Sequence, residues 1–175
     1  MNTSNIKKYA PQARNDFIAA MRKQAAKYGI TADSILPAEQ KGDLLLIGDQ
    51  VFPLSVMKSR EKLIKRIQTS SFEQTIDYIA YSWFNRLCAI RYMECKGLLD
   101  HGRRVLSSAD GSAGLPQILE ECLDIDLPGL DASRVAELKL DGNKDEELYR
   151  ELLLAQCHAL NQVMPLLFEQ VSDES

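Results

Sequence analysis

Four cations gather on one side of a predicted helix, and their spacing is suited to binding phosphates. The helix is predicted from about residue 53 to residue 68, and Glu61 is its only acidic residue. On the side opposite its apolar residues, it carries Lys58, Lys62, Lys65 and Arg66. Such a basic side can bind a nucleic-acid backbone, with an affinity that is independent of sequence and falls as salt rises. The alternative interpretation is an ordinary solvated helix face.

A second feature is an arginine within an apolar segment. Residues 80–102 contain the one tryptophan of the chain, Trp83, and Arg86 lies at the edge of the apolar stripe to which Trp83 belongs. A buried guanidinium requires a carboxylate, a set of carbonyls or a phosphate. We predict a structural ion pair for Arg86, with an acid from the 120s or 140s. Contact with a ligand or nucleic acid is the alternative, and Asn85 is interpreted as a hydrogen-bond organiser of the core.

The helix that contains Arg86 is predicted to be buried almost all round. One of its apolar stripes contains Trp83, and a second stripe holds Tyr78, Tyr81, Asn85 and Tyr92. A helix that is apolar on nearly every side is expected to be the central element of its domain.

Residues of the common catalytic and metal sites form no recognisable arrangement. His101 and His158 have no Cys or His at metal-ligand spacing, so both are interpreted as surface residues. The loop Asp110–Gly114 lacks the lysine of a phosphate-binding P-loop. Neither G-x-S-x-G nor G-x-G-x-x-G occurs. We therefore predict no catalytic, cofactor-binding or metal-binding residue in this chain.

The cysteines and the apolar runs indicate a cytoplasmic protein. No cysteine pair has C-x-x-C spacing, and reduced core thiols are predicted at Cys88, Cys95, Cys122 and Cys157. No apolar run is long enough to cross a bilayer, and the first residues lack the apolar region of a secretory signal. We expect a cytoplasmic protein without a membrane partner.

The elements that must position these residues are mostly helical. Apolar residues at steps of three and four predict helices over residues 11–28, 53–68 and from 70 or 71 to 96, with Gly29 and Gly97 as stops. Residues 30–42 are predicted irregular, and Gly48-Asp49 separates the two strands of a hairpin. Short helices follow at 116–122 and 131–139, and a final helix over 145–168 is weakened by Pro165. The fold is predicted mainly α: three long helices plus short helices, with one small β-hairpin.

Length and charge give two further constraints. The 175 residues fit one helical domain, 1–175. Residues 1–66 contain 12 Lys/Arg and 6 Asp/Glu, whereas residues 67–175 contain 9 and 19. The basic first part points to a polyanion or an acidic partner, although soluble domains without such partners also show this asymmetry.

Several strings resemble one family over essentially the whole chain. They are "MNTSNIKKYAPQARNDFI", "YIAYSWFNRLCAIRYMECKGLLDHGRRVLS", "LPGLD" and "LKLDGNKDEELYRELLLAQCHALNQVMPLLFE". Together they resemble the N-terminal region of the adenine-specific DNA methyltransferases of bacteriophage-exclusion (BREX) defence systems, the PglX family. The strings "WFNR…AIRYME" and "LDGNKD" are quite specific.

The resemblance implies a parent enzyme of the restriction-modification kind that methylates adenine N6 with S-adenosylmethionine, as an antiviral mark of self. That family uses a glycine-rich cofactor loop and an Asn/Asp-Pro-Pro-Tyr motif that grips a flipped adenine. Neither motif occurs here, so no catalytic residue can be carried over. We expect a fragment or a truncated form without the catalytic domain, inactive alone.

Two functions of different classes follow. In the first, the chain supports its own catalytic domain and contacts double-stranded DNA through Lys58, Lys62, Lys65 and Arg66. In the second, it is an interaction module for other BREX subunits, or for a phage inhibitor that mimics DNA. A structural support that only covers the methyltransferase fold is a third possibility, which a large exposed apolar patch would favour.

Overall fold

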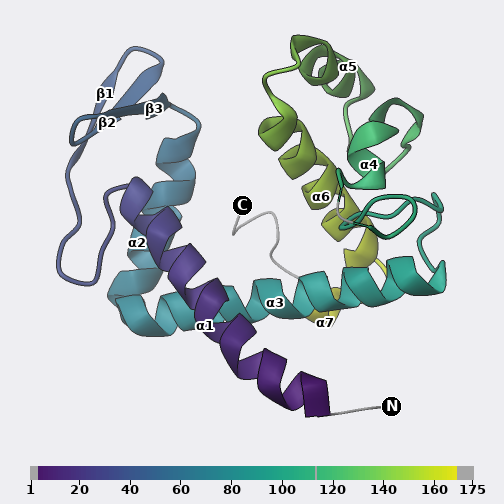
Figure 1. Cartoon of the computed structure of the whole chain (residues 1–175). Helices are drawn as coiled ribbons and strands as arrows, with labels where there is room; N and C mark the ends of the chain where they lie inside the picture. Colours follow the sequence, from purple (N-terminus) through teal and green to yellow (C-terminus); the bar gives the residue numbers. More distant parts are fainter. Residues whose placement is uncertain (1–3, 113, 169–175) are drawn as a thin grey trace. The chain divides into compact units, whose positions relative to one another are not determined.

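The computed structural model describes residues 4–112 and 114–168, and of residues 4–8 the backbone alone (Figure 1). The described part is mainly α with one small antiparallel sheet, so the predicted fold class is confirmed. In chain order its elements are α1 (Ser4–Lys27), β1 (Ala38–Lys41), β2 (Leu44–Ile47), β3 (Gln50–Pro53), α2 (Val56–Thr69), α3 (Phe72–Lys96), α4 (Gln117–Glu120), the 3₁₀ helix η1 (Cys122–Asp124), α5 (Ala132–Asp141), α6 (Asp145–Asn161) and α7 (Pro165–Phe168).

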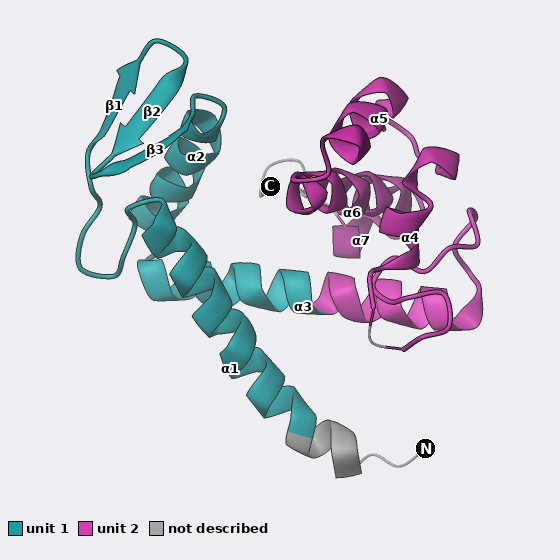
Figure 2. Cartoon of the chain, turned by 45° about the horizontal axis from the view of Figure 1, so that its top comes forward, with its two compact units in different colours: residues 1–84, 174 teal, residues 85–173, 175 magenta. Residues whose placement is uncertain are grey.

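The described chain forms two compact units, and the boundary between them lies within α3 (Figure 2). The first unit contains α1, the sheet, α2 and the beginning of α3 up to Phe84. The second begins at Asn85 and contains the end of α3 and every later element. The assignment of residues 1–175 to one domain stays a prediction.

Helix α1 begins earlier than predicted and ends where predicted. Pro11 was expected in the first turn, but the helix starts at Ser4 and Pro11 lies inside it. At the other end, the N–H of Gly29 donates to the carbonyl of Ala26, and the N–H of Ile30 to that of Ala25, both at 3.0 Å. This is the Schellman pattern, and it places Gly29 at φ 69°. A Cβ on Gly29 would also lie 2.6 Å from Ile47, so only glycine fits.

The sheet has one more strand than expected. β2 and β3 pair as the predicted hairpin across Gly48-Asp49. β1 also pairs with β2, across Gly42-Asp43, so the prediction of an irregular segment over residues 30–42 was wrong at Ala38–Lys41. The repeated Gly-Asp pair was the available signal, because positive-φ glycines suit two-residue hairpin turns.

Two apolar clusters hold the first unit together. One contains Ala25, Ile30, Phe72 and Ile76, against which α2 packs Leu63, Ile64 and Ile67. The other lies between the sheet and α2: Leu45, Ile47 and Phe52 pack against Tyr28, Val56 and Met57. The predicted apolar side of α2 is therefore confirmed as its packed side.

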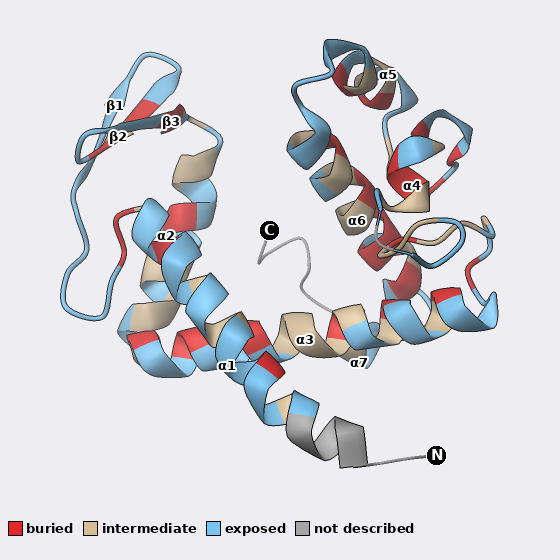
Figure 3. Cartoon of the chain, viewed as in Figure 1, coloured by how far each residue is buried: buried red, intermediate tan, exposed pale blue. Residues whose placement is uncertain are grey.

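Helix α3 is less enclosed than expected. Its start is capped by Ser71, whose Oγ accepts the N–H of Gln74 at 3.1 Å, and it ends at Gly97 as predicted. Its second stripe, which was expected in the core, is open: Tyr78, Tyr81 and Tyr92 are 45%, 67% and 61% exposed. Figure 3 colours several segments of α3 as exposed or intermediate. Asn85 is half-buried. The prediction of a helix buried almost all round was therefore wrong.

In the second unit, the final predicted helix is two helices. α6 ends at Asn161, a turn follows, and α7 begins at Pro165, so Pro165 separates two helices rather than weakening one. Leu148, Leu152 and Leu160 of α6 are buried, as are Ile118 of α4 and Leu138 of α5. The helix predicted over 131–139 is α5, capped by Asp131 and ended by Gly142 in the left-handed conformation.

A buried carboxylate orders the long loop after α3. Glu94 has a fully buried side chain. Its Oε2 accepts the N–H groups of Val105 and Leu106, each at 2.8 Å, and its Oε1 accepts from Ser107 and Arg91. These bonds satisfy a charge that would be costly to bury alone. One side chain of α3 thus fixes the loop that follows the helix.

Candidate nucleic-acid interface

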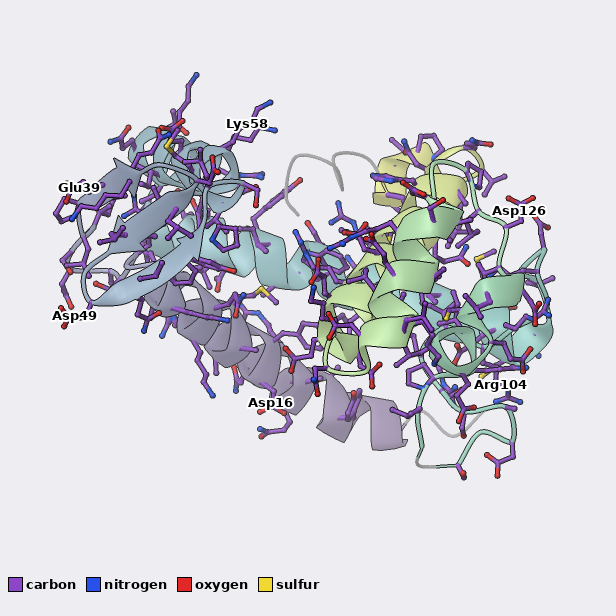
Figure 4. All side chains as sticks on the ribbon, turned by 90° about the horizontal axis from the view of Figure 1, so that it is seen from above. Asp16, Glu39, Asp49, Lys58, Arg104 and Asp126 are labelled. Atoms are coloured by element: carbon purple, nitrogen blue, oxygen red, sulfur yellow. The ribbon has the colours of Figure 1, made fainter. Side chains whose placement is uncertain are left out.

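Helix α2 has one packed side and one basic side. Lys58, Lys62 and Lys65 are exposed, whereas the apolar residues of the helix are at least half-buried. Lys58 extends away from the ribbon (Figure 4). Among the described residues, neither Lys58 nor Lys65 makes a hydrogen bond or ion pair. The helix wheel therefore placed the three lysines correctly, and their role in binding DNA stays a prediction.

Arg66 differs from the lysines. It is half-buried, and its guanidinium carbon lies 4.1 Å from the centroid of the Tyr78 ring of α3. That distance is within the range of a cation–π contact, which orients the guanidinium over the ring face. The predicted basic side thus ends in an arginine that is held by a neighbouring helix.

A fifth cation of α2 was missed by the wheel. Arg60 is 8% exposed and lies on the packed side. Its Nε donates to the carbonyl of Tyr28 at 2.9 Å, and its Nη2 donates to the carbonyl of Leu36. Burial lowers the pKa of this guanidinium. The missed signal was its place among the apolar residues of the wheel, because an arginine there has to satisfy its donors within the protein.

Two arginines of α1 lie against the acidic residues at the start of α3. Arg14 pairs with Asp77 at 3.2 Å, and Arg22 pairs with Glu73. All four side chains are about half exposed, so each pair contributes little to stability. Their effect is electrostatic: Glu73 and Asp77, the carboxylates of the first two turns of α3, each have a compensating charge.

The two units differ in charge. Residues 1–84 carry 12 Lys/Arg and 8 Asp/Glu, a formal charge of +4, and residues 85–175 carry 9 and 17, a formal charge of −8. The basic side of α2 lies in the positive unit. A positive unit is the more favourable of the two for a polyanion, and it is the unit that carries the candidate residues.

Arg86 lies in the second unit and is 2% exposed. Its Nε donates to the carbonyl of Leu167 at 3.1 Å, which links α3 to α7. A carbonyl is one of the partners that a buried guanidinium was expected to require. The ion pair predicted for Arg86 stays a prediction. Its burial makes Arg86 a structural residue rather than part of an exposed binding surface.

The four cysteines divide into a buried pair and an exposed pair. Cys122 and Cys157 are buried as predicted, but Cys88 and Cys95 are exposed, so the core prediction was wrong for them because they lie on the open side of α3. Residues 4–112 and 114–168 hold no group of three or more His, Cys, Asp or Glu side chains able to bind a metal. Within the same residues, no helix has the length and apolar character of a membrane span.

His101 is not a plain surface residue. Its Nδ1 accepts the N–H of Arg103 at 3.1 Å, so its Nε2 is the nitrogen that donates to Gln156, at 2.6 Å. Gln156 is 3% exposed and lies on α6. The histidine therefore joins the loop after α3 to α6.

Comparison with known proteins confirms the resemblance seen in the sequence. No protein-family model matches the chain. Over 182 aligned residues that cover all of this chain, it is 50% identical to the adenine-specific methyltransferase BrxX of Escherichia coli O9:H4 (strain HS). It is 30% identical over 192 residues to the adenine-specific methyltransferase PglX of Lacticaseibacillus casei (strain Zhang). The chain spans only 15% and 16% of the lengths of these relatives.

Proposed function

We propose that this chain is a helical module of a BREX-type adenine-specific DNA methyltransferase, and that its basic helix contacts the DNA backbone. The similarity to BrxX and PglX over the whole chain supports the first part. The chain corresponds to a small share of those relatives, so the chemistry belongs to a parent enzyme. In that enzyme, S-adenosylmethionine would supply the methyl group, and a catalytic domain outside these 175 residues would bind this cofactor.

The observation that carries the DNA contact is the division of α2 into a packed side and a basic side. Because Leu63, Ile64 and Ile67 fix one side against the core, the opposite side is held outward. Lys58, Lys62 and Lys65 lie there at steps of four and three residues, which places their ammonium groups along one line of the helix. Lysines so placed bind phosphates and release counterions, so they give affinity without reading sequence.

The test compares two double charge reversals of equal size. Lys58→Glu with Lys65→Glu removes two cations of the basic side, and Lys96→Glu with Arg150→Glu removes two exposed cations of the other unit. Both variants change the formal net charge from −4 to −8. Duplex binding is measured across a range of salt. We expect the first variant to lower the slope of log K against log salt by about 1.8, since each contact contributes about 0.9.

Equal effects of the two variants would contradict the proposal, because they would show a response to net charge alone. A weaker affinity that is confined to the α2 variant supports it. Thermal unfolding of both variants checks that neither has lost its fold. Exposed positions such as these usually change stability by no more than about 0.5 kcal/mol.

A second candidate function, docking of another protein, is favoured by exposed apolar residues of the second unit. Leu140 and Leu166 are 88% and 97% exposed, and Leu123 is 65% exposed. Contiguous exposed apolar surface marks docking sites, and exposed leucines such as these are the residues that would contribute to it. The partner would be the catalytic domain, another subunit of the defence system or a DNA-mimicking inhibitor. Duplex binding by the chain together with no recovery of any of these partners would argue against docking as its role.

A further inference from the structure

The basic side of α2 continues onto α3 through one pair of residues. Arg66 follows Lys65 directly and lies four residues after Lys62, so it is the last cation of the basic side. Its guanidinium lies 4.1 Å above the Tyr78 ring, and Tyr78 belongs to α3. The surface that carries the lysines therefore ends against an exposed aromatic residue of the next helix.

A second tyrosine extends this surface. Tyr81 lies three residues after Tyr78, so the two side chains share one side of α3 a turn apart. Tyr81 is 67% exposed and Tyr78 is 45% exposed. An exposed tyrosine beside a basic surface has two uses in nucleic-acid binding: its hydroxyl donates to a phosphate, or its ring stacks on an unpaired base.

The acidic residues of this part of α3 do not prevent a phosphate from approaching. Glu73 and Asp77 are the carboxylates of its first two turns, and Asp77 lies four residues before Tyr81. Both are paired with arginines of α1, Asp77 with Arg14 and Glu73 with Arg22. Each pair has no net charge, and on α2 itself the cations Lys58, Lys62, Lys65 and Arg66 outnumber the one acid, Glu61.

We propose that α3 forms the second half of the DNA interface, with Tyr81 donating its hydroxyl to a backbone phosphate and Tyr78 positioning Arg66. This inference rests on the proposed function, because it extends the same surface. The interface favours duplex DNA over an unpaired strand, since the lysines follow one line of a helix and Tyr81 lies one helical turn from Tyr78, whose ring contacts the last cation. Tyr78 acts through Arg66 and is a positioning residue.

The test measures binding of a fluorescent duplex to the 175-residue chain and its variants across salt. Tyr81→Phe removes only the hydroxyl. We expect it to weaken binding by about three- to tenfold, the range of one net hydrogen bond. The salt slope should stay unchanged, because no cation is lost. Tyr92→Phe is the matched control: Tyr92 is also on α3 and 61% exposed, but it lies in the other unit.

Two further variants test the role of Tyr78. Tyr78→Phe keeps the ring under Arg66 and should bind like the unchanged chain. Tyr78→Leu removes the ring and should lower the salt slope by up to about 0.9, because Arg66 then loses its fixed place at the interface. If Tyr78 had only a structural role, Tyr78→Leu would lower the unfolding temperature and leave the salt slope unchanged. That result would overturn the positioning role of Tyr78.

The outcomes separate the inference from the proposed function. If Tyr81→Phe binds like the unchanged chain while the Lys58 and Lys65 reversals weaken binding, the inference is overturned and the proposed function stands. If Tyr81→Ala weakens binding but Tyr81→Phe does not, the ring stacks and the hydroxyl contact is wrong. If the unchanged chain does not bind duplex at low salt, both fail.

Discussion

The Nε of Arg60 donates to the carbonyl oxygen of Tyr28 at 2.9 Å. Lys58, two residues earlier on the same helix, is exposed and has no partner among the described residues. Two cations of helix α2 thus differ in role: Arg60 holds the end of α1 and the segment after it, whereas Lys58 faces solvent. A cation in the position of Lys58 can bind a phosphate, and one in the position of Arg60 cannot.

Replacing Arg60 should destabilise the fold. Arg60→Met keeps most of the packing volume but removes the donors to Tyr28 and Leu36. Because hydrogen bonds to charged groups contribute about 1.5–3 kcal/mol, we expect the free energy of unfolding to fall by about 2–3 kcal/mol. Urea denaturation measures it, with Lys58→Met as the control. Equal stability of the two variants would contradict the structural role of Arg60.

Arg86→Ala should be among the most destabilising single changes in the chain. Arg86 is almost fully buried and donates to Leu167, so alanine leaves a cavity and an unmatched carbonyl. If its predicted ion pair also forms, the loss should reach about 3–5 kcal/mol. Thermal unfolding measures the change against Arg150→Ala, an exposed site on α6. Unchanged stability with altered DNA binding would overturn the structural assignment.

Glu94→Gln should loosen the loop after α3. Every acceptor position of this carboxylate faces a donor, so the amide NH₂ of glutamine must oppose one of them whichever way it is turned. We expect a loss of about 2–3 kcal/mol. Faster hydrogen exchange at the amides of Val105 and Leu106 would show that this loss of stability arises in the loop. The control is Glu137→Gln, which changes an exposed carboxylate. If these two amides are protected from exchange in Glu94→Gln as well as in the unchanged chain, the anchoring role of Glu94 is refuted.

The four cysteines should separate into two pairs by reactivity. At pH 8, an aromatic disulfide reagent should titrate Cys88 and Cys95, which are exposed, and should reach Cys122 and Cys157 only after denaturation. Burial raises the pKa of Cys157 to about 12, so it stays a thiol at this pH. Partial burial also raises the pKa of Cys88, which should react more slowly for that reason. Four fast-reacting thiols in the native chain would contradict the placement of Cys122 and Cys157.

Much of the fold could be predicted because local patterns determine it. Gly29 and Gly97 end α1 and α3 at the points where the apolar periodicity stops, and Gly48-Asp49 forms the turn of a hairpin. The start of α1 was missed because Pro11 was assigned to a first turn, whereas the structure continues the helix through it. Strand β1 was missed because it is exposed throughout and so has no apolar pattern.

The candidate site was predictable only in part. A helical wheel separates Lys58 from Leu63, but it does not show which side of a helix has a neighbour. For that reason Tyr81 and Cys88 were expected in the core, although they lie on the open side of α3. The contact between Arg66 and Tyr78 joins two helices, and no spacing within one helix reveals it.

The central claim is that the basic side of α2 binds the DNA backbone, and duplex binding by the 175-residue chain across salt tests it most directly. With contacts from Lys58, Lys62, Lys65 and Arg66, log K should fall linearly with log salt, with a slope of about −3.6. The affinity should be nearly the same for unrelated sequences. No binding even at low salt would contradict the claim and leave docking of a protein partner as the function to test.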